Sequence, residues 1–326
     1  MLHYSSFCKK NNPHQGDAKQ HMHLSTLERR HYVIGFALII FMVSCATLLH
    51  DFEIILPEIG ALTAGTWIYQ NEGWINQPVK IFLAPSGTAI IGFLINQLNI
   101  TYALKVILGL LLMLILLRLL NSNLAPSFAT GLLPIIINAT HWSFIGAILI
   151  FTAILMAGVF LQKEYKTAQP APNIKMQHMI VFAILATTWV GAVWFFGFSQ
   201  MAAIPPVMVV FFEVLQKPNY SWRMASKHFI ALVGAATIGV LVHLFFASWL
   251  ISTIIALPLV FLLLQLLRIK LPAAYAFPLL ALVLPTNMFH MLPITAILAT
   301  TFFLGSLVVL KKIVPIFQST REVNND

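Results

Sequence analysis

Charged residues are absent from five long stretches of this 326-residue chain. No Asp, Glu, Lys or Arg occurs in the ranges 81–104, 119–162, 176–212, 228–267 and 271–310. A helix that crosses a bilayer needs about 20 consecutive apolar residues, and the longer stretches have room for two such helices. Only 9% of all residues are charged, against about 25% in soluble domains. The chain is therefore predicted to be an integral membrane protein.

The membrane spans are predicted to be helices, because the apolar stretches lack the alternating pattern of membrane β-strands. Residues 31–310 leave room for twelve crossings of about 23 residues each. Four short runs remain open, since each could cross the bilayer or re-enter it: 54–70, 124–138, 201–216 and 272–287. The predicted fold is an all-α, polytopic transmembrane helix bundle of about twelve spans.

The Lys and Arg residues predict how the chain is oriented, because they favour cytoplasmic loops. With twelve crossings and a cytoplasmic N-terminus, only Lys105 falls on the external side, while Asp51 and Glu53 lie in the first external loop. If the short runs 54–70 and 201–216 re-entered the membrane instead of crossing it, the basic cluster at 217–227 would lie on the outside. We therefore expect a multi-pass protein of the cell membrane, a bacterial inner membrane, with both termini in the cytoplasm.

A shift of 147 residues aligns the sequence with itself. KIFLAPSGTAIIGFL (80–94) and KHFIALVGAATIGVL (227–241) agree at eight of fifteen positions, and a shift of 146 places Pro126 on Pro272. The pattern predicts two parallel six-helix repeats, each beginning and ending on the same side. The predicted divisions are a cytoplasmic polar tail (1–30), repeat 1 (31–162), a cytoplasmic linker (163–177), repeat 2 (178–310) and a cytoplasmic tail (311–326).

Small residues recur every four positions on the third helix of each repeat. Ala84, Thr88 and Gly92 share one face in the first repeat, and Ala231, Ala235 and Gly239 do so in the second. In lipid, close backbone approach through small residues is a main source of attraction between helices. These faces are interpreted as contacts across the axis between the repeats or as packing within one repeat.

The first of these segments resembles a known family. In QPVKIFLAPSGTAIIGF, Pro78, Thr88, Ala89 and Gly92 fall at the spacing of the Pro, Ser, Ala and Gly in the HPP-family motif P-R-N-x-x-G-G-H-x-x-S-A-x-x-G. The run 125–129, and residues 271–274 in the second half, are similar to the H-P-P-A stretch that names the family, without its His and with one Pro in place of two. The resemblance implies a tandem-duplicated membrane protein, and some family members are linked to nitrite movement. A weaker likeness is to six-helix aromatic-acid exporters.

Prolines in the fifth helix of each repeat suggest where a solute would bind. Transporter sites lie at the interface between repeats, where interrupted helices expose backbone groups. This reasoning selects Pro126, Ser127 and Thr130 in the first repeat, with Pro272 and Tyr275 in the second. The alternative is that the prolines only shape helix packing.

Three further residues complete the predicted substrate-binding set. Glu58 follows Pro57 near the expected outer surface, where a buried carboxyl group could couple transport to protons. Asn96 and His243 are repeat mates at the outer ends of the third helices. Each of these polar side chains also has a structural explanation, as an exposed group or as a hydrogen-bonded bridge between helices.

These features predict a secondary-type permease for a small solute, and a small anion is one candidate. The solute path is predicted to run between the two repeats. The chain holds no phosphate-binding loop, HExxH or GxSxG motif, and Cys8 and Cys45 form no framework. No catalytic residue, metal or cofactor is therefore expected. The expected partners are the lipid bilayer and the solute, with self-association left open and no nucleic acid. An aromatic-acid-exporter-like permease, a membrane enzyme acting on a lipid and a non-transporting scaffold remain alternatives.

Overall fold

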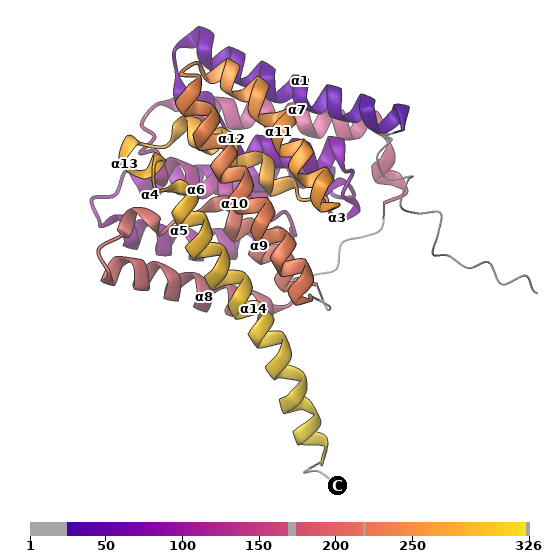
Figure 1. The fold of residues 1–326 in the computed structure, drawn as a ribbon, viewed down its shortest axis with the longest axis vertical. Coiled ribbons are helices and arrows are strands. Elements are labelled where there is room, and N and C mark those ends of the chain that lie inside the picture. Colours follow the sequence, from indigo (N-terminus) through magenta and orange to yellow (C-terminus); the bar gives the residue numbers. More distant parts are fainter. Residues whose placement is uncertain (1–24, 169–173, 218–219, 324–326) are drawn as a thin grey trace, which may run out of the picture.

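A computed structural model of the protein describes residues 25–168, 174–217 and 220–323. Most of the predicted N-terminal tail, including Cys8, and part of the predicted linker lie outside these ranges. Every regular element within the described ranges is helical, as predicted. The protein is thus an all-helical bundle (Figure 1).

Eight helices in the described ranges are long and apolar enough to cross a membrane. Each has at least 18 residues, and a helix of 20 residues spans the roughly 30 Å of a bilayer's hydrocarbon core. The described residues therefore support a membrane-embedded bundle. The eight are α1 (Thr26–Leu49), α4 (Pro78–Asn96), α5 (Tyr102–Leu119), α7 (Trp142–Gln162), α8 (Met176–Phe195), α10 (Trp222–Phe245), α11 (Trp249–Leu267) and α14 (Leu292–Val323).

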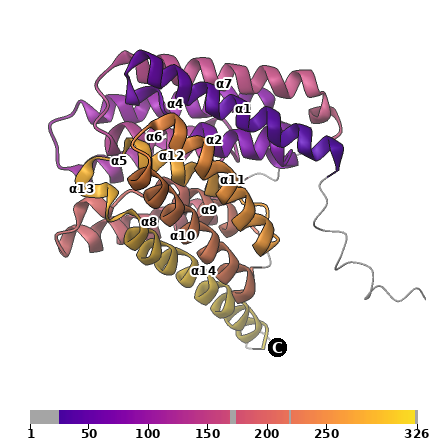
Figure 2. The ribbon, with the colours of Figure 1, turned by 45° about the horizontal axis from the view of Figure 1, so that its top comes forward.

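The four runs left open by the sequence form short helices in the middle of the bundle (Figure 2). They are α2 (Pro57–Thr63) continued by the π-helix η3 (Ala64–Ile68), α6 (Pro126–Ile136), α9 (Pro205–Leu215), and η6 (Pro272–Tyr275) continued by α12 (Ala276–Val283). All their residues are buried except Glu213. They are too short to span a bilayer as helices alone, and non-helical backbone flanks them inside the bundle. Such backbone is tolerated at membrane depth only where protein covers it.

Proline is the first residue of all four short elements. A proline at this position costs no hydrogen bond, because the first N–H groups of a helix have no partner within it. Proline also favours an extended residue before it, and Leu56, Ile204 and Leu271 have φ between −132° and −113°. Pro126 and Pro272 therefore begin helices, and the prolines inside these short helices are Pro134 and Pro278.

Hydrogen bonds at the helix ends show that the chain passes back and forth between two ends of the bundle. At one end, Lys80 bonds the carbonyl of Asn121, and Gln70 bonds Gln162. At the other, Asn96 bonds Asn138, and Glu53 bonds the backbone of His141. The long and short elements of the first half thus run alternately in opposite directions.

The two ends differ sharply in charge. In the described part of the chain up to Lys312, every Lys and Arg except Lys105 lies at or next to the end that holds Lys80, which we call the basic end. Arg118 there donates to the carbonyl of Ile174 over 2.9 Å. The opposite end holds Lys105, Glu53 and the short helix α13 (Thr286–Phe289).

The small-residue faces predicted on α4 and α10 pack within their own half of the chain. Thr88 Oγ1 lies 2.7 Å from Thr130 Oγ1 of α6. A Cβ atom added to Gly92 would lie 1.7 Å from the carbonyl oxygen of Gly131, and one added to Gly239 would lie 2.8 Å from the Cα of Pro278. Glycine is needed at these positions because two backbones touch.

Several contacts of the first half recur about 147 residues later. Lys80 donates to the carbonyl of Asn121, and Lys227 to that of Leu267. Gly87 faces Leu116 as Gly234 faces Leu263, with distances from an added Cβ of 2.8 and 2.7 Å. Lys105 lies against Asn96, as Ser252 lies against His243. Corresponding helices of the two halves therefore meet through corresponding residues.

We predict that Gly92→Ala lowers the stability of the protein by about 1–3 kcal/mol, since the new methyl group must displace backbone. The matched control is Gly146→Ala on α7, where no atom lies within 4 Å of the added Cβ. Thermal unfolding in detergent, followed by circular dichroism, measures both variants. Equal midpoints for the two variants would contradict the packing described.

Candidate functional site

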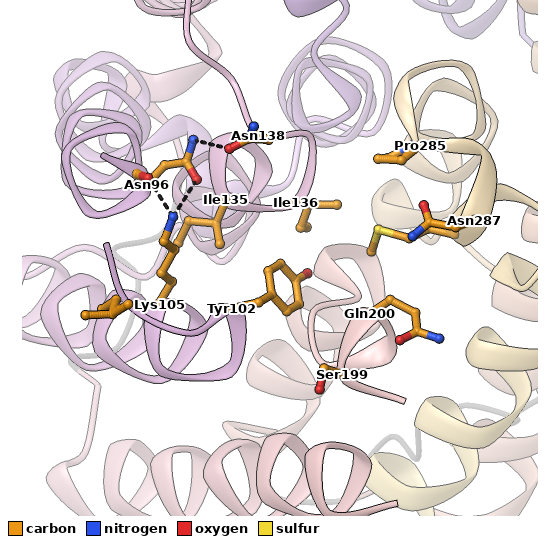
Figure 3. Close-up of a pocket in the computed structure, with 12 residues that line it drawn as sticks. Asn96, Tyr102, Lys105, Ile135, Ile136, Asn138, Ser199, Gln200, Pro285 and Asn287 are labelled. Carbon is orange, nitrogen blue, oxygen red and sulfur yellow. Dashed lines mark hydrogen bonds between the residues drawn. The ribbon is translucent and has the colours of Figure 1, made fainter. Parts of the chain in front are cut away.

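A cavity of about 490 Å³ opens at the end of the bundle opposite the basic end (Figure 3). One wall comes from the ends of α4, α5 and α6, and the other from segments of the second half near Gln200 and Asn287. The two halves of the chain therefore share this space. Its lining residues are Asn96, Ile100, Tyr102, Lys105, Ile135, Ile136, Asn138, Ser199, Gln200, Pro285, Asn287 and Met288.

A hydrogen-bond network orders the first wall of the cavity. Lys105 Nζ donates to the backbone carbonyl of Asn96 over 2.7 Å, and its distance to Asn96 Oδ1 is 3.4 Å. Asn96 Nδ2 in turn donates to Asn138 Oδ1 over 3.2 Å and to the carbonyl of Ala139 over 3.0 Å. Asn96 is the last residue of α4, so Lys105 satisfies a carbonyl that has no partner within the helix.

Local backbone geometry places these side chains together. Asn138 follows the end of α6 with φ of 52°, in the left-handed region that Asn tolerates better than most residues. Lys105 stands in the first turn of α5, nine residues after Asn96, so the short connection between α4 and α5 brings the two together. The tight turns at this end of the bundle thus build the polar wall.

Tyr102 brings an unpaired hydroxyl group to the cavity. Its ring extends from the start of α5 toward the second half (Figure 3). The hydroxyl oxygen is buried and has no hydrogen-bond partner in the protein. A buried polar atom without a partner calls for a water or ligand that satisfies it. Tyr102 is therefore the lining residue that most directly offers a hydrogen bond to a bound molecule.

The second wall adds amide and hydroxyl groups. Ser199 and Gln200 belong to the single turn η5 (Ser199–Met201), and Asn287 belongs to α13. No carboxylate is among the lining residues, and Lys105 is their one cation. This combination of amides, hydroxyls and a lysine suits a small polar or anionic molecule.

The predicted site residues Asn96 and His243 line two different cavities. Asn96 lines the cavity of Figure 3. His243 lines a second cavity of about 280 Å³, together with Thr286, Phe289 and His290. Its Nδ1 lies 3.3 Å from Ser252 Oγ. The repeat mates predicted at one site thus occupy separate spaces at the same end of the bundle.

The predicted residues of the fifth helices are packed inside the protein and do not line the cavity of Figure 3. Pro126, Ser127 and Thr130 are fully buried in α6, and Thr130 Oγ1 donates to the carbonyl of Ser127 over 2.7 Å. Pro272 and Tyr275 are buried as well, and the Tyr275 hydroxyl lies 3.4 Å from that of Tyr69. Their role in binding a solute stays a prediction.

Two carboxyl groups in the segment that follows α1 are buried, and only one is well bonded. Glu53 is 1% exposed, although the sequence placed it in an external loop. It accepts the N–H groups of Thr140 and His141, each over 3.0 Å, and lies 3.1 Å from His141 Nδ1. Glu58 is also 1% exposed, and its Oε1 has no partner. The carboxylate of Glu53 thus accepts hydrogen bonds at the start of α7. No comparable contact explains why the carboxyl group of Glu58 is buried.

The sequence analysis missed most of the polar lining: Tyr102, Lys105, Ser199, Gln200 and Asn287. The sequence feature that could have pointed to this lining was Lys105, the one basic residue that the orientation rule left on the external side. The other four are uncharged, and their proximity depends on how the two halves meet.

Comparison with known proteins identifies no relative. No protein-family profile matches the chain, and neither the curated proteins nor the solved structures provide a match.

We predict that Glu53→Ala destabilises the protein by about 1–3 kcal/mol, since two buried N–H groups at the start of α7 lose their acceptor. Glu72→Ala is the control, because Glu72 is exposed. Urea or thermal unfolding in detergent measures the difference. A midpoint for Glu53→Ala equal to that for Glu72→Ala would show that the carboxylate does not hold α7 in place.

Proposed function

We propose that the protein is a secondary permease for a small solute, not an enzyme, and that the solute passes between two parallel repeats. The order of elements supports the repeats: long, short, long, long, short, long occurs first from α1 to α7 and again from α8 to α14. The contacts that recur about 147 residues apart support the same duplication.

The proposed topology has twelve passages, eight through long helices and four through the short ones. Each repeat then contains six passages, so both repeats begin at the same end of the bundle. Repeats of this kind are related by an axis along the membrane normal. The short helices resemble the interrupted helices of secondary transporters in lying at the centre of the bundle.

The proposed orientation places the basic end in the cytoplasm. Lys and Arg are retained on the cytoplasmic side of membrane proteins, and among the described residues up to Lys312 this end holds all of them except Lys105. The first residues of α1 and the last apolar turns of α14 would then both be cytoplasmic. We propose a bacterial inner membrane as the location, with the cavity of Figure 3 facing outward.

The observation that carries the proposal is the cavity shared by the two halves. A solute path between repeats requires a polar opening at their junction, and residues of both halves line this one. Lys105, the amide groups and the Tyr102 hydroxyl favour a small anion as solute.

The HPP family stays the proposed relative. Two segments that carry the resemblance, around Gly92 on α4 and Pro126 on α6, lie on helices in close contact, since Gly92 touches Gly131. On this proposal the chain is a duplicated, divergent member. Nitrite is then one solute to test, and benzoate tests the likeness to aromatic-acid exporters.

Flux into proteoliposomes tests the proposal. Purified protein is reconstituted, and uptake of nitrite, formate and benzoate is compared with that of protein-free vesicles. We expect at least one of these anions to enter faster with protein present. Uptake equal to that of empty vesicles for all three would overturn the proposed function.

Lys105→Met is expected to lower this uptake by about 10-fold or more, because a charged hydrogen bond contributes roughly 1.5–3 kcal/mol. Lys80→Met is the matched control: Lys80 also bonds a carbonyl at the end of a helix, but at the basic end. An equal loss of uptake in both variants would indicate that Lys105 only supports the fold.

Tyr102→Phe separates binding from folding. The hydroxyl group has no partner in the protein, so its removal should leave the unfolding midpoint unchanged or slightly raised. We expect the apparent affinity for the transported anion to fall by about 3- to 10-fold, the loss of one hydrogen bond. Unchanged affinity would remove Tyr102 from the proposed site.

A further inference from the structure

Glu58 is a buried carboxyl group that the fold does not use. It is the second residue of α2, is 1% exposed, and its Oε1 lacks a hydrogen-bond partner. Glu53, five residues earlier and equally buried, is bonded by two N–H groups and by His141. The two carboxyl groups are thus equally buried, but only that of Glu58 has an oxygen, Oε1, without a partner.

The surroundings of Glu58 supply no basic side chain at its level. α2 packs against η6, α12, α6, α7 and α1. In these elements α6, α7 and α12 carry no Asp, Glu, His, Lys or Arg, and η6 contributes only Tyr275. α1 contributes Tyr32 and Cys45, and its charged residues, 28–31, lie in its first turns at the basic end. The preceding turn η2 (Phe52–Ile54) adds Glu53, already bonded.

Other polar atoms near this part of the bundle also lack partners. Thr63 Oγ1 on α2 and Ser127 Oγ on α6 are buried without hydrogen bonds, and α2 packs against α6. Buried polar groups are normally satisfied by protein or by ordered water. On α2 and α6, buried atoms of Glu58, Thr63 and Ser127 thus lack a partner among the described residues.

The backbone of this crossing is unusual. α2 passes into η3, a π-helix, and η3 ends just before Gln70 at the basic end. π-Helical turns are rare and occur often at functional sites. The crossing starts beside Glu53 at the outer end, so Glu58 lies between the two ends of the bundle on an irregular helix.

We propose that Glu58 is the proton-binding group that couples solute movement to the proton gradient. This inference rests on the proposed permease function. A carboxylate buried without a cation is unstable in an apolar interior and takes up a proton. A carboxylate oxygen of Glu58 accepts one proton from the outer side, the neutral acid persists while the site is closed, and the O–H bond releases the proton to the basic side. Position 58 corresponds to Pro205 or Pro206 in the second half, so no carboxyl group stands at the equivalent position there.

Proteoliposomes with an acidic exterior test the coupling, with nitrite and formate as probes. The wild-type protein is expected to accumulate a probe under the pH gradient. Glu58→Gln should reduce this accumulation at least 10-fold while exchange of probe across the membrane remains measurable. Glu213→Gln is the matched control: Glu213 Oε1 is also buried without a partner, but Glu213 lies in the last turn of α9 at the basic end. It should behave as wild type.

Infrared spectroscopy gives a second readout that does not depend on transport. At neutral pH the wild-type protein should show the carbonyl stretch of a protonated carboxyl group, and Glu58→Gln should weaken this band more than Glu213→Gln does. Absence of the band in the wild type would overturn the proposal. So would accumulation by Glu58→Gln equal to that of wild type, or wild-type accumulation driven only by sodium. If the wild-type protein moves neither probe in either mode, and does not move benzoate either, the permease function fails together with the coupling. That result is distinct from a wild type that exchanges probe without responding to pH.

Discussion

The hydrogen-bonding needs of the backbone in lipid govern the architecture of this protein. Hydrocarbon offers no partner to an exposed N–H or C=O group, so non-helical segments inside the membrane must be covered by protein. Four short helices with non-helical ends lie in the middle, and eight long helices surround them (Figure 2). Residues next to the prolines, such as Leu56 and Leu271, are almost completely buried for this reason.

Close backbone contact replaces the hydrophobic effect as the force that holds these layers together. Lipid tails are as apolar as leucine, so helices gain little by leaving them, and packing depends on small residues. Gly92 against Gly131 and Gly239 against Pro278 bring the second long helix of each half, α4 and α10, onto its short neighbour. This contact fixes the end of α4, where Asn96 and Lys105 form one wall of the cavity.

The two buried carboxyl groups illustrate how far sequence reasoning reaches. An acidic residue beside an apolar run is visible in the sequence, and Glu58 was selected on that basis. Its position relative to the surface was not predictable, and Glu53 was assigned to an external loop. The burial of each carboxyl group depends on the helices that cover it. The pairing of Glu53 depends on Thr140 and His141, which are nearly ninety residues further along the chain. For the same reason Gln200 and Asn287 could not be joined to Asn96 without the fold.

The sequence by itself determined the membrane environment, the helical class and the internal similarity at 147 residues, because hydropathy, the need for internal hydrogen bonds and repeated Lys and Gly positions are local properties of the chain. Tertiary structure decided which apolar runs became long helices and which became short buried ones. It also decided that the small-residue faces pack within each half and which polar groups share a cavity. These outcomes depend on distances between segments far apart in the chain, and hydropathy alone carries no information about them.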